Sequence, residues 1–198
     1  MFEAAYSSVS DPPSKRKILE AALHLFALKG VHAVTVREIA GEAGYTNPAL
    51  FKFFATKDAL ALHLFECCYL RLFERLNAAA GSGLPFGERL SAILDVFFSQ
   101  IEEDAEAFLF VQDHLREMWP RVPRSTRRKS ILALIRSTLE QGVRESSVTA
   151  ETSPDLLVAA IIGTLQQFAR MFYFGEFKGR ARDWAPEIEI IVRRTVAP

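Results

Sequence analysis

A short polar stretch, Thr46-Asn47-Pro48, followed by Lys52, has the residue types that could recognise another molecule. Asn47 carries both a donor and an acceptor for the edge of a base, and Thr46 can reach a base, its methyl group or a phosphate. Lys52 lies one to two helical turns further on, where a phosphate is the expected target. Thr46 as a helix cap alone and Lys52 as solvated surface are the alternatives. We expect a recognition helix that enters the major groove of DNA with its N-terminus first.

The elements that must position this stretch are two short helices. Thr35 followed by Glu38 makes a capping box, which predicts a helix start, and apolar residues then fall on one face of a helix over 36–43. Gly44 marks the end of that helix, because glycine reaches a left-handed conformation at little steric cost. A second helix over 47–53 follows after three or four residues. This spacing is typical of a helix-turn-helix.

The pattern continues on both sides of the two helices, and the sequence resembles the tetracycline-repressor (TetR) family of one-component transcription regulators. The residues that carry the resemblance are Ile18, Leu19, Ala21, Ala22, Leu25, Phe26, Gly30, Thr35, Val36, Ile39, Ala40, Ala43, Gly44, Tyr45, Thr46, Ala49, Leu50, Phe51, Phe54, Lys57 and Leu60. The resemblance implies that Thr35, Arg37 and Lys57 contact the DNA backbone. Thr35 as a helix cap alone and Arg37 as solvated surface are the alternatives. Beyond about residue 65 it depends only on length and an all-helical pattern.

The expected fold is all-α with about nine helices, because no period-two alternation or fixed-period repeat occurs. We expect a flexible arm over 1–13 and a three-helix DNA-binding domain over 14–57. A helical domain over 58–198 would bind an effector and form the dimer.

Two residues depart from the family pattern. Phe51 stands where the family commonly has a tyrosine whose hydroxyl reaches a phosphate, and Pro48 stands where a glycine is common. The first change removes a donor, and the second stiffens the entry to the recognition helix. Both residues are expected at the DNA interface, and both leave the operator sequence open.

Composition limits the other functions that the chain could have. Its 198 residues are 49% hydrophobic, so a sizeable core can form without disulfides. The 24 basic and 24 acidic residues cancel, and residues 1–65 carry seven of the former against six of the latter. DNA contact must therefore come from the placement of a few charges. Cys67 and Cys68 are expected to be reduced, and neither a signal peptide nor a membrane span is recognised. These features favour a cytoplasmic location without a membrane partner.

The sequence lacks the common catalytic and cofactor motifs. Its four histidines form no HExxH, and no GxSxG, glycine-rich phosphate loop or CxxC pair occurs. We therefore expect neither an enzyme nor a metal or cofactor site. A helical interaction protein is the second alternative to a DNA-binding regulator.

The second domain is rich in phenylalanine. Helices are expected over 57–80, 88–103, 105–118, 124–145, 154–174 and 184–196, and most of the aromatic side chains are explained as core. A helical bundle lined by aromatic side chains with a few polar groups is also a suitable site for an apolar effector, which would act as an inducer. The expected lining is Phe97, Phe98, Phe108, Gln112, His114, Met118, Gln167, Phe168, Met171 and Phe172.

The last two helices carry apolar stripes that could pair with a second copy. The resemblance implies a four-helix interface in a homodimer, which would present two recognition helices to a pseudo-palindromic operator. The interface residues expected from the stripes are Leu157, Ala160, Ile161, Thr164, Ile188, Ile191, Val192 and Thr195. Repression is expected, and activation without an effector is the alternative.

Overall fold

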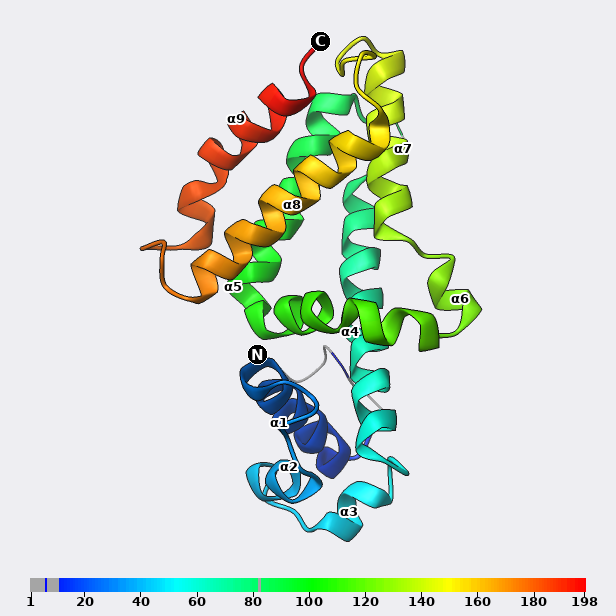
Figure 1. Ribbon diagram of the computed structural model, residues 1–198, viewed down its shortest axis with the longest axis vertical. Helices are drawn as coiled ribbons and strands as arrows, with labels where there is room; N and C mark the ends of the chain where they lie inside the picture. Colours follow the sequence, from blue (N-terminus) through cyan, green and yellow to red (C-terminus); the bar gives the residue numbers. More distant parts are fainter. Residues whose placement is uncertain (1–5, 7–10, 82) are drawn as a thin grey trace. The chain divides into compact units, whose positions relative to one another are not determined.

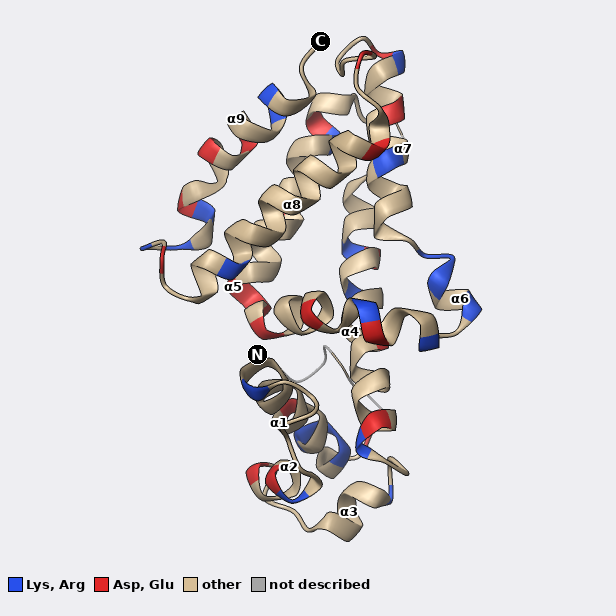
Figure 2. Ribbon diagram, in the orientation of Figure 1, with Lys and Arg blue, Asp and Glu red and all other residues tan. Residues whose placement is uncertain are grey.

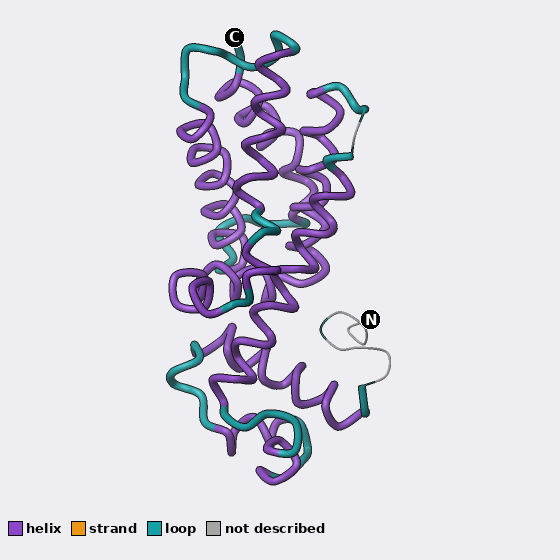
Figure 3. Tube along the Cα trace, turned by 90° about the vertical axis from the view of Figure 1, so that its right-hand side faces the viewer, coloured by secondary structure: helices purple, strands orange, loops and turns teal. Residues whose placement is uncertain are grey.

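The computed structural model describes Tyr6, residues 11–81 and residues 83–198, and the described part of the chain is helical without strands (Figure 1, Figure 3). The predicted all-α class is therefore confirmed. Most of the expected arm over 1–13 lies outside the described residues. The α-helices are α1 (Pro13–Lys29), α2 (Val36–Glu42), α3 (Asn47–Phe51), α4 (Lys57–Ala79), α5 (Phe86–Met118), α6 (Arg124–Arg127), α7 (Ile131–Arg144), α8 (Pro154–Tyr173) and α9 (Ala185–Val196), with short 3-10 helices at Trp119–Arg121 and Ala181–Trp184.

One predicted helix is divided in the structure. The single helix expected over 124–145 is broken into α6 and α7, with Ser130 between them in an extended conformation. The Ser130 hydroxyl accepts a hydrogen bond from the backbone N–H of Ala133 at 3.2 Å, so it caps α7. The cap at Ser130 therefore starts a new helix, although the apolar residues continue at helical spacing through this point.

The structure also explains the predicted break between helices 88–103 and 105–118. Helix α5 runs through both, but Asp104 inside it has φ −162° and ψ 68°. This extended residue separates two helical segments, as the sequence predicted. The backbone carbonyl of Asp104 accepts a hydrogen bond from the buried Gln100 side chain at 3.4 Å, which partly replaces the interrupted helical pairing.

The chain forms two compact units. Unit 1 contains the described residues up to Arg71 together with Glu106–Arg128, and unit 2 contains Leu72–Ala105 and Lys129–Pro198. The first three helices therefore share a unit with the start of α4 and the second segment of α5. The functional division at residue 57 stays a prediction, because the compact units follow packing and not function.

Unit 1 has an aromatic and aliphatic core that supports the first three helices. Ile18, Ala22 and Phe26 of α1 are buried, and the Phe26 ring stacks on Phe110 of α5 with centroids 5.9 Å apart. A contact at the surface joins the same two helices, since the His24 Nδ1 and Glu106 Oε1 atoms are 2.7 Å apart. The second segment of α5 thus packs directly on α1.

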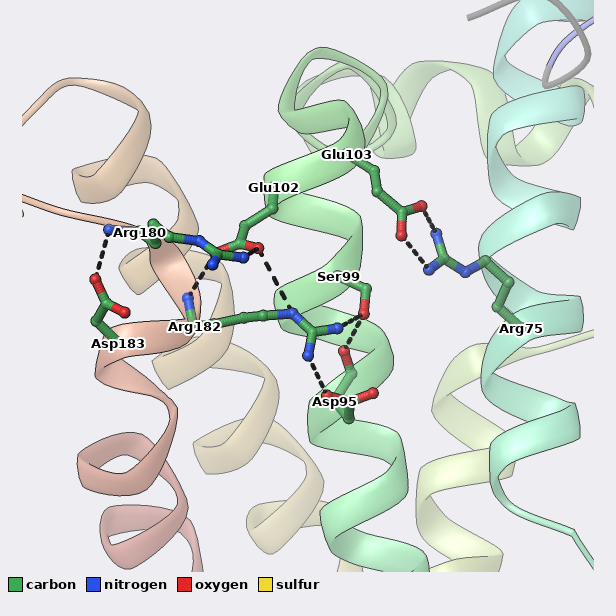
Figure 4. A network of polar contacts seen from close by, with 8 residues as sticks. All are labelled: Arg75, Asp95, Ser99, Glu102, Glu103, Arg180, Arg182 and Asp183. Atoms are coloured by element: carbon green, nitrogen blue, oxygen red, sulfur yellow. Dashed lines mark hydrogen bonds and ion pairs between the residues drawn. The ribbon is translucent and has the colours of Figure 1, made fainter. Parts of the chain in front are cut away.

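Unit 2 is held together by polar contacts on two sides of the first segment of α5 (Figure 4). Arg182, in the 3-10 helix before α9, donates to Asp95 at 2.9 Å and also contacts Ser99. Arg75 of α4 pairs with Glu103 at 2.9 Å on the same helix. Arginine forks and carboxylates therefore fix the first segment of α5 to α4 and to the segment that leads into α9.

Helix α8 is unusually apolar for its exposure. Asp155 and Arg170 are its only charged residues, and Figure 2 shows the rest of the ribbon in tan. An 18-residue window has a mean hydropathy of 1.3, enough to cross a membrane by length and composition, and 33% of it is buried. Core helices and helices at protein interfaces pass the same test. The sequence of α8 alone therefore does not distinguish these environments.

Gly142 allows a close approach inside unit 2. A Cβ atom at this position in α7 would lie 2.7 Å from the Phe86 ring and in contact with Val148. We expect Gly142→Ala to lower the free energy of unfolding by about 1–3 kcal/mol, because the core cannot yield without strain. Gly41→Ala is the control, since a Cβ there meets nothing within 4 Å. Denaturant unfolding measures both, and equal stability of the two variants would contradict the expectation.

Candidate nucleic-acid interface

The start of α2 is fixed by the capping box that the sequence predicted. The Glu38 carboxylate accepts hydrogen bonds from the backbone N–H and the hydroxyl of Thr35, both at 2.8 Å. The Thr35 hydroxyl in turn accepts from the Glu38 N–H at 3.2 Å. The Lys29 ammonium at the end of α1 pairs with the same carboxylate at 3.0 Å. The sequence did not predict this contact, because it joins two different helices. Glu38 therefore ties α2 to α1.

The turn after α2 closes with the hydrogen bonds of a Schellman motif. Gly44 has φ +73°, in the left-handed region, and its N–H donates to the Gly41 carbonyl at 3.1 Å. The Tyr45 N–H donates to the Ala40 carbonyl at 2.8 Å. The last carbonyls of α2 are thus satisfied within a few residues, and the chain reverses directly into α3.

Helix α3 presents one buried and one exposed face. Leu50 is fully buried and anchors the helix in unit 1. Asn47 and Pro48 in the first turn are exposed, and so are Lys52 and Phe51, of which 49% is accessible. The helix ends at Phe51, earlier than the end at residue 53 that the sequence predicted. Its polar N-terminus faces solvent.

Four of the predicted DNA-contacting side chains are free among the described residues. The side chains of Arg37, Thr46 and Asn47 are exposed and make no hydrogen bond or ion pair there, and the Lys52 ammonium lies only over the Phe53 ring at 5.9 Å. Thr46 occupies the N-cap of α3, but its hydroxyl does not cap the helix. The cap expected from the sequence is therefore absent at the side-chain level. These donors and acceptors remain available for a partner.

Two predicted contacts are already engaged inside the protein. The Thr35 hydroxyl is used in the capping box. The Lys57 ammonium donates to the carbonyl oxygens of Val31 and Val34, each at 2.6 Å, and to that of His32 at 3.4 Å. An ammonium has three protons, so these acceptors use its donor capacity. Sequence reasoning had no means to find this role, because the acceptors are backbone atoms of another loop.

The ten predicted pocket residues divide between the two units. Unit 2 holds Phe97, Phe98, Gln167, Phe168, Met171 and Phe172, and unit 1 holds Phe108, Gln112, His114 and Met118. In unit 2 the Phe168 ring lies 6.3 Å from Phe97, 5.7 Å from Phe98 and 6.0 Å from Phe172. Gln167 and Met171 are instead exposed on α8. Sequence reasoning missed Phe177, whose ring lies 5.0 Å from Phe168, because it follows the helix in a loop.

The pocket residues of unit 1 are mostly enclosed. Phe108 and Met118 are buried, and both ring nitrogens of His114 have partners within the unit. The Gln112 Nε2 atom is also buried, but it has no hydrogen-bond partner among the described residues. An unpaired buried amide is costly, so Gln112 is the polar group here that a ligand could satisfy.

The predicted dimer residues lie on two different faces. Leu157, Ile161, Ile188 and Val192 are buried within unit 2, where they join α8 and α9 to the core. They are therefore unavailable at the surface, and their place in the expected interface is corrected. The exposed positions among the eight are Ala160, Ile191 and Thr195, with Thr164 half-buried. A stripe in the sequence does not show which side of a helix faces its own core.

The cysteines and histidines do not assemble a reactive centre in the described ranges. Burial raises the pKa of the Cys67 thiol to about 11, and burial also raises that of Cys68. Burial therefore favours the protonated thiol over the reactive thiolate at both positions. No group of three or more His, Cys, Asp or Glu side chains there could hold a metal ion.

The capping box has a measurable pH dependence. The pKa of Glu38 is lowered from 4.5 to about 2, first by the backbone hydrogen bond from Thr35 and then by the Lys29 ammonium. A lowered folded-state pKa means that the carboxylate stabilises the fold fully above pH 4.5, and that this contribution is lost as the pH falls from 4.5 toward 2. Glu38→Gln keeps the shape of the side chain but cannot ionise. We expect it to reduce the change of the thermal unfolding midpoint with pH between pH 4.5 and 2.

The control for this prediction is Glu42→Gln, an exposed glutamate in the same helix. It should leave the pH dependence of the midpoint close to that of the unmodified protein. An NMR titration of the Glu38 carboxyl group with a midpoint near 4.5 would show that the capping box does not lower the pKa of Glu38.

Comparison with known proteins relates the chain to bacterial regulators. Residues 18–64 match the model of the family described as bacterial regulatory proteins, tetR family. The HTH-type transcriptional repressor KstR2 of Mycobacterium tuberculosis is 28% identical over 152 residues, covering 75% of this chain and 76% of that protein. The HTH-type transcriptional activator FasR of Mycolicibacterium smegmatis is 30% identical over 103 residues, 51% of this chain and 47% of that protein.

A solved structure extends the similarity to nearly the whole chain. The structure of the ketosteroid transcriptional regulator KstR2 of Mycobacterium tuberculosis matches with a TM-score of 0.83 at 25% identity. The match covers 98% of this chain and 99% of that one. Both compact units thus belong to a known helical architecture.

Proposed function

Because the chain belongs to the TetR family of transcriptional regulators, we propose that it is a repressor that binds a pseudo-palindromic operator as a homodimer and leaves it when a small apolar effector binds. Members of this family are DNA-binding regulators and not enzymes. The observation that carries the proposal is the exposed N-terminus of α3, where Thr46 and Asn47 have unused donors and acceptors. The protein would act in the cytoplasm, together with its operator DNA.

Recognition of the operator would combine base and phosphate contacts. Asn47, in the first turn of α3, can pair through its amide with the edge of an adenine, and the free Thr46 hydroxyl can add a second contact. Lys52 and Arg37 are exposed cations on either side of the turn and suit the phosphates. Thr35 and Lys57 would act mainly by positioning, because their polar groups are engaged internally.

Phe51 would give this recognition helix a preference for particular bases that a tyrosine at the same position would not give. Its ring is 49% exposed on α3 and cannot donate to a phosphate. An exposed aromatic side chain in the major groove can contact the methyl group of thymine. We therefore propose that Phe51 favours a thymine in each half-site where a tyrosine would have bound the backbone. Pro48 stiffens the preceding turn and reduces the ordering that binding requires.

A single copy of this surface would bind weakly. The formal net charge of the chain is zero, so no general field draws it to DNA. Two copies related by a two-fold axis would place their recognition helices about 34–36 Å apart and read both half-sites. Dimerisation would therefore supply the affinity and length of site that one copy lacks.

The exposed face of α8 is the proposed dimer surface, together with α9. Its members on α8 are apolar, small or uncharged: Leu156, Ala159, Ala160, Gly163, Gln167 and Met171. Leu156 is 65% exposed, and Ile190 and Ile191 of α9 are about half exposed. A Cβ atom on Gly163 would meet nothing within 4 Å, so a second helix can approach closely there. Pairing with a second copy would remove this apolar face from water.

The effector is proposed to be apolar with at least one acceptor oxygen. Each unit by itself has a feature that suits such a ligand. Four phenylalanine side chains meet in unit 2 and suit an apolar body. In unit 1 the unpaired Gln112 amide offers a donor for an acceptor oxygen, and Phe108 and Met118 of the same segment are buried. The similar KstR2 structure is that of a ketosteroid transcriptional regulator, and ketosteroids combine an apolar ring system with carbonyl oxygens. A ligand of this general class would suit either unit.

Activation is the second candidate. It is favoured by the similarity of about half of the chain to an activator, FasR. Binding to DNA would be the same in both cases, and the position of the operator relative to the promoter would decide between them. A helical interaction protein, the third alternative, would not bind DNA specifically.

Selection of binding sites from a random duplex library, followed by gel-shift titration, tests the proposal. We expect a two-fold symmetric site. Asn47→Ala should weaken binding to it about 5- to 150-fold per half-site, because one bidentate base contact contributes about 1–3 kcal/mol of discrimination. Recovery of no preferred sequence at low salt would exclude the repressor and activator alike.

A charge-matched pair of variants tests the phosphate contact. Lys52→Ala should reduce the slope of log affinity against log salt by about one per half-site, because one fewer counterion is released. Lys178→Ala makes the same charge change at an exposed position in unit 2 and should leave the slope unaltered. Equal slopes in the two variants would remove Lys52 from the interface.

Native mass spectrometry of the purified protein tests the dimer and the effector together. We expect the mass of two chains, with a co-purifying small molecule retained. Gly163→Arg should yield monomers, because it adds a charged side chain to the face where the helices approach. Ser137→Arg is the control, since it adds the same side chain at an exposed position of α7. A monomeric unmodified protein would contradict the proposed interface.

A further inference from the structure

The loop between α1 and α2 is held from two sides within unit 1. Val31 and Val34 in this loop are each 1% exposed, and their backbone groups bond to side chains from distant parts of the sequence. The Val31 N–H faces His114 of α5, at 3.4 Å from its Nε2 atom. The Val31 carbonyl accepts from the Lys57 ammonium at 2.6 Å. One residue is thus bonded through both its donor and its acceptor.

The contacts of His114 define its protonation. Its Nδ1 atom lies 3.0 Å from the Phe110 carbonyl oxygen, which can only accept, so Nδ1 carries the proton. Its Nε2 atom then has a free lone pair and accepts from the Val31 N–H. The ring is 9% exposed and packs on Phe110 with centroids 4.8 Å apart. His114 is therefore an oriented acceptor for Val31, and it has no nitrogen left for an effector.

Lys57 completes the arrangement from the first residue of α4. Its ammonium also donates to the Val34 carbonyl at 2.6 Å. Val34 directly precedes Thr35, the N-cap of α2. The position at which α2 begins is therefore fixed against α4 by Lys57 and against the second segment of α5 by His114.

The opposite face of the same α5 segment carries the unpaired group. Gln112 and His114 are two residues apart, which is about 200° around a helix axis. The Gln112 Nε2 atom is buried without a partner among the described residues, whereas His114 is fully paired. A ligand that binds Gln112 and shifts or rotates this segment would displace His114 from Val31.

We propose that His114 is a positioning residue that couples the segment 106–118 to the helix-turn-helix through Val31 and Lys57. This inference rests on the proposed function and names the contact by which that function is regulated. With the Val31 bond formed, α2 begins at a fixed place and α3 is presented for DNA binding. Displacement of the segment breaks the bond, frees the loop and lowers the affinity for the operator.

Two substitutions of His114 separate this role from simple packing. His114→Gln places an amide oxygen near the position of Nε2 and can still accept from Val31, whereas His114→Phe fills the space without an acceptor. Amide hydrogen exchange at Val31, followed by NMR, reports the bond without DNA or effector. We expect about fivefold faster exchange in His114→Phe, for one lost hydrogen bond, and a rate close to that of the unmodified protein in His114→Gln.

Gel shifts on the selected operator supply the functional readout. His114→Phe should weaken binding about fivefold per half-site with an unchanged slope against salt, and His114→Gln should keep the affinity close to that of the unmodified protein. Lys57→Met should also weaken binding without a change of slope, because Lys57 acts through the loop and not through a phosphate. A slope reduced by about one per half-site would instead make Lys57 a phosphate contact and overturn its part in the proposal.

Failure of the coupling and failure of the proposed function give different results. If the unmodified protein selects no operator, the proposed function fails, while exchange at Val31 still measures the His114 contact. If His114→Phe leaves both Val31 exchange and operator affinity unchanged, the coupling role is overturned. Should His114→Phe fail to fold, the salt dependence of Lys57→Met still tests the loop, since it removes the other partner of Val31.

Discussion

The left-handed turn at Gly44 is the constraint on which the proposed DNA-reading surface depends. A side chain at φ +73° would be strained, and only a residue in this conformation lets the Gly44 and Tyr45 N–H groups return to the end of α2. The chain then reverses within a few residues and starts α3 with Asn47 at the surface and Leu50 in the core. The direction of α3, and therefore the side chains that it presents, follows from that backbone geometry.

The polar residues around this turn divide into two groups by their hydrogen bonds. Thr35 and Lys57 satisfy backbone groups of the protein, so they maintain the arrangement of the helices. Thr46, Asn47 and Lys52 leave the polar atoms of their side chains in solvent. The cost of burying an unpaired N–H or carbonyl explains the first group, and the availability of donors for a partner explains the second.

Because the chain has no net charge, its affinity for DNA would depend more on the placement of individual side chains than on long-range electrostatic attraction. With 24 basic and 24 acidic residues, the chain gains little from long-range attraction to phosphates. Small movements of a recognition helix should then matter, because few contacts supply the specificity. This sensitivity suits a regulator in which the start of α2 is held by one buried histidine and one lysine.

The sequence by itself determined the helical class, the capping box and the glycine turn, because caps, periods and left-handed positions are local properties of the chain. It also located the break in α5, but it did not reveal the cap at Ser130 that divides α6 from α7. Only the tertiary structure decided which side of α8 is buried, so Leu157 and Ile161 proved to be core while Ala160 and Gly163 face outward. It alone joined His114 and Lys57 to Val31, because hydrogen bonds between residues 83 and 26 positions apart depend on packing and leave no periodic trace in the sequence.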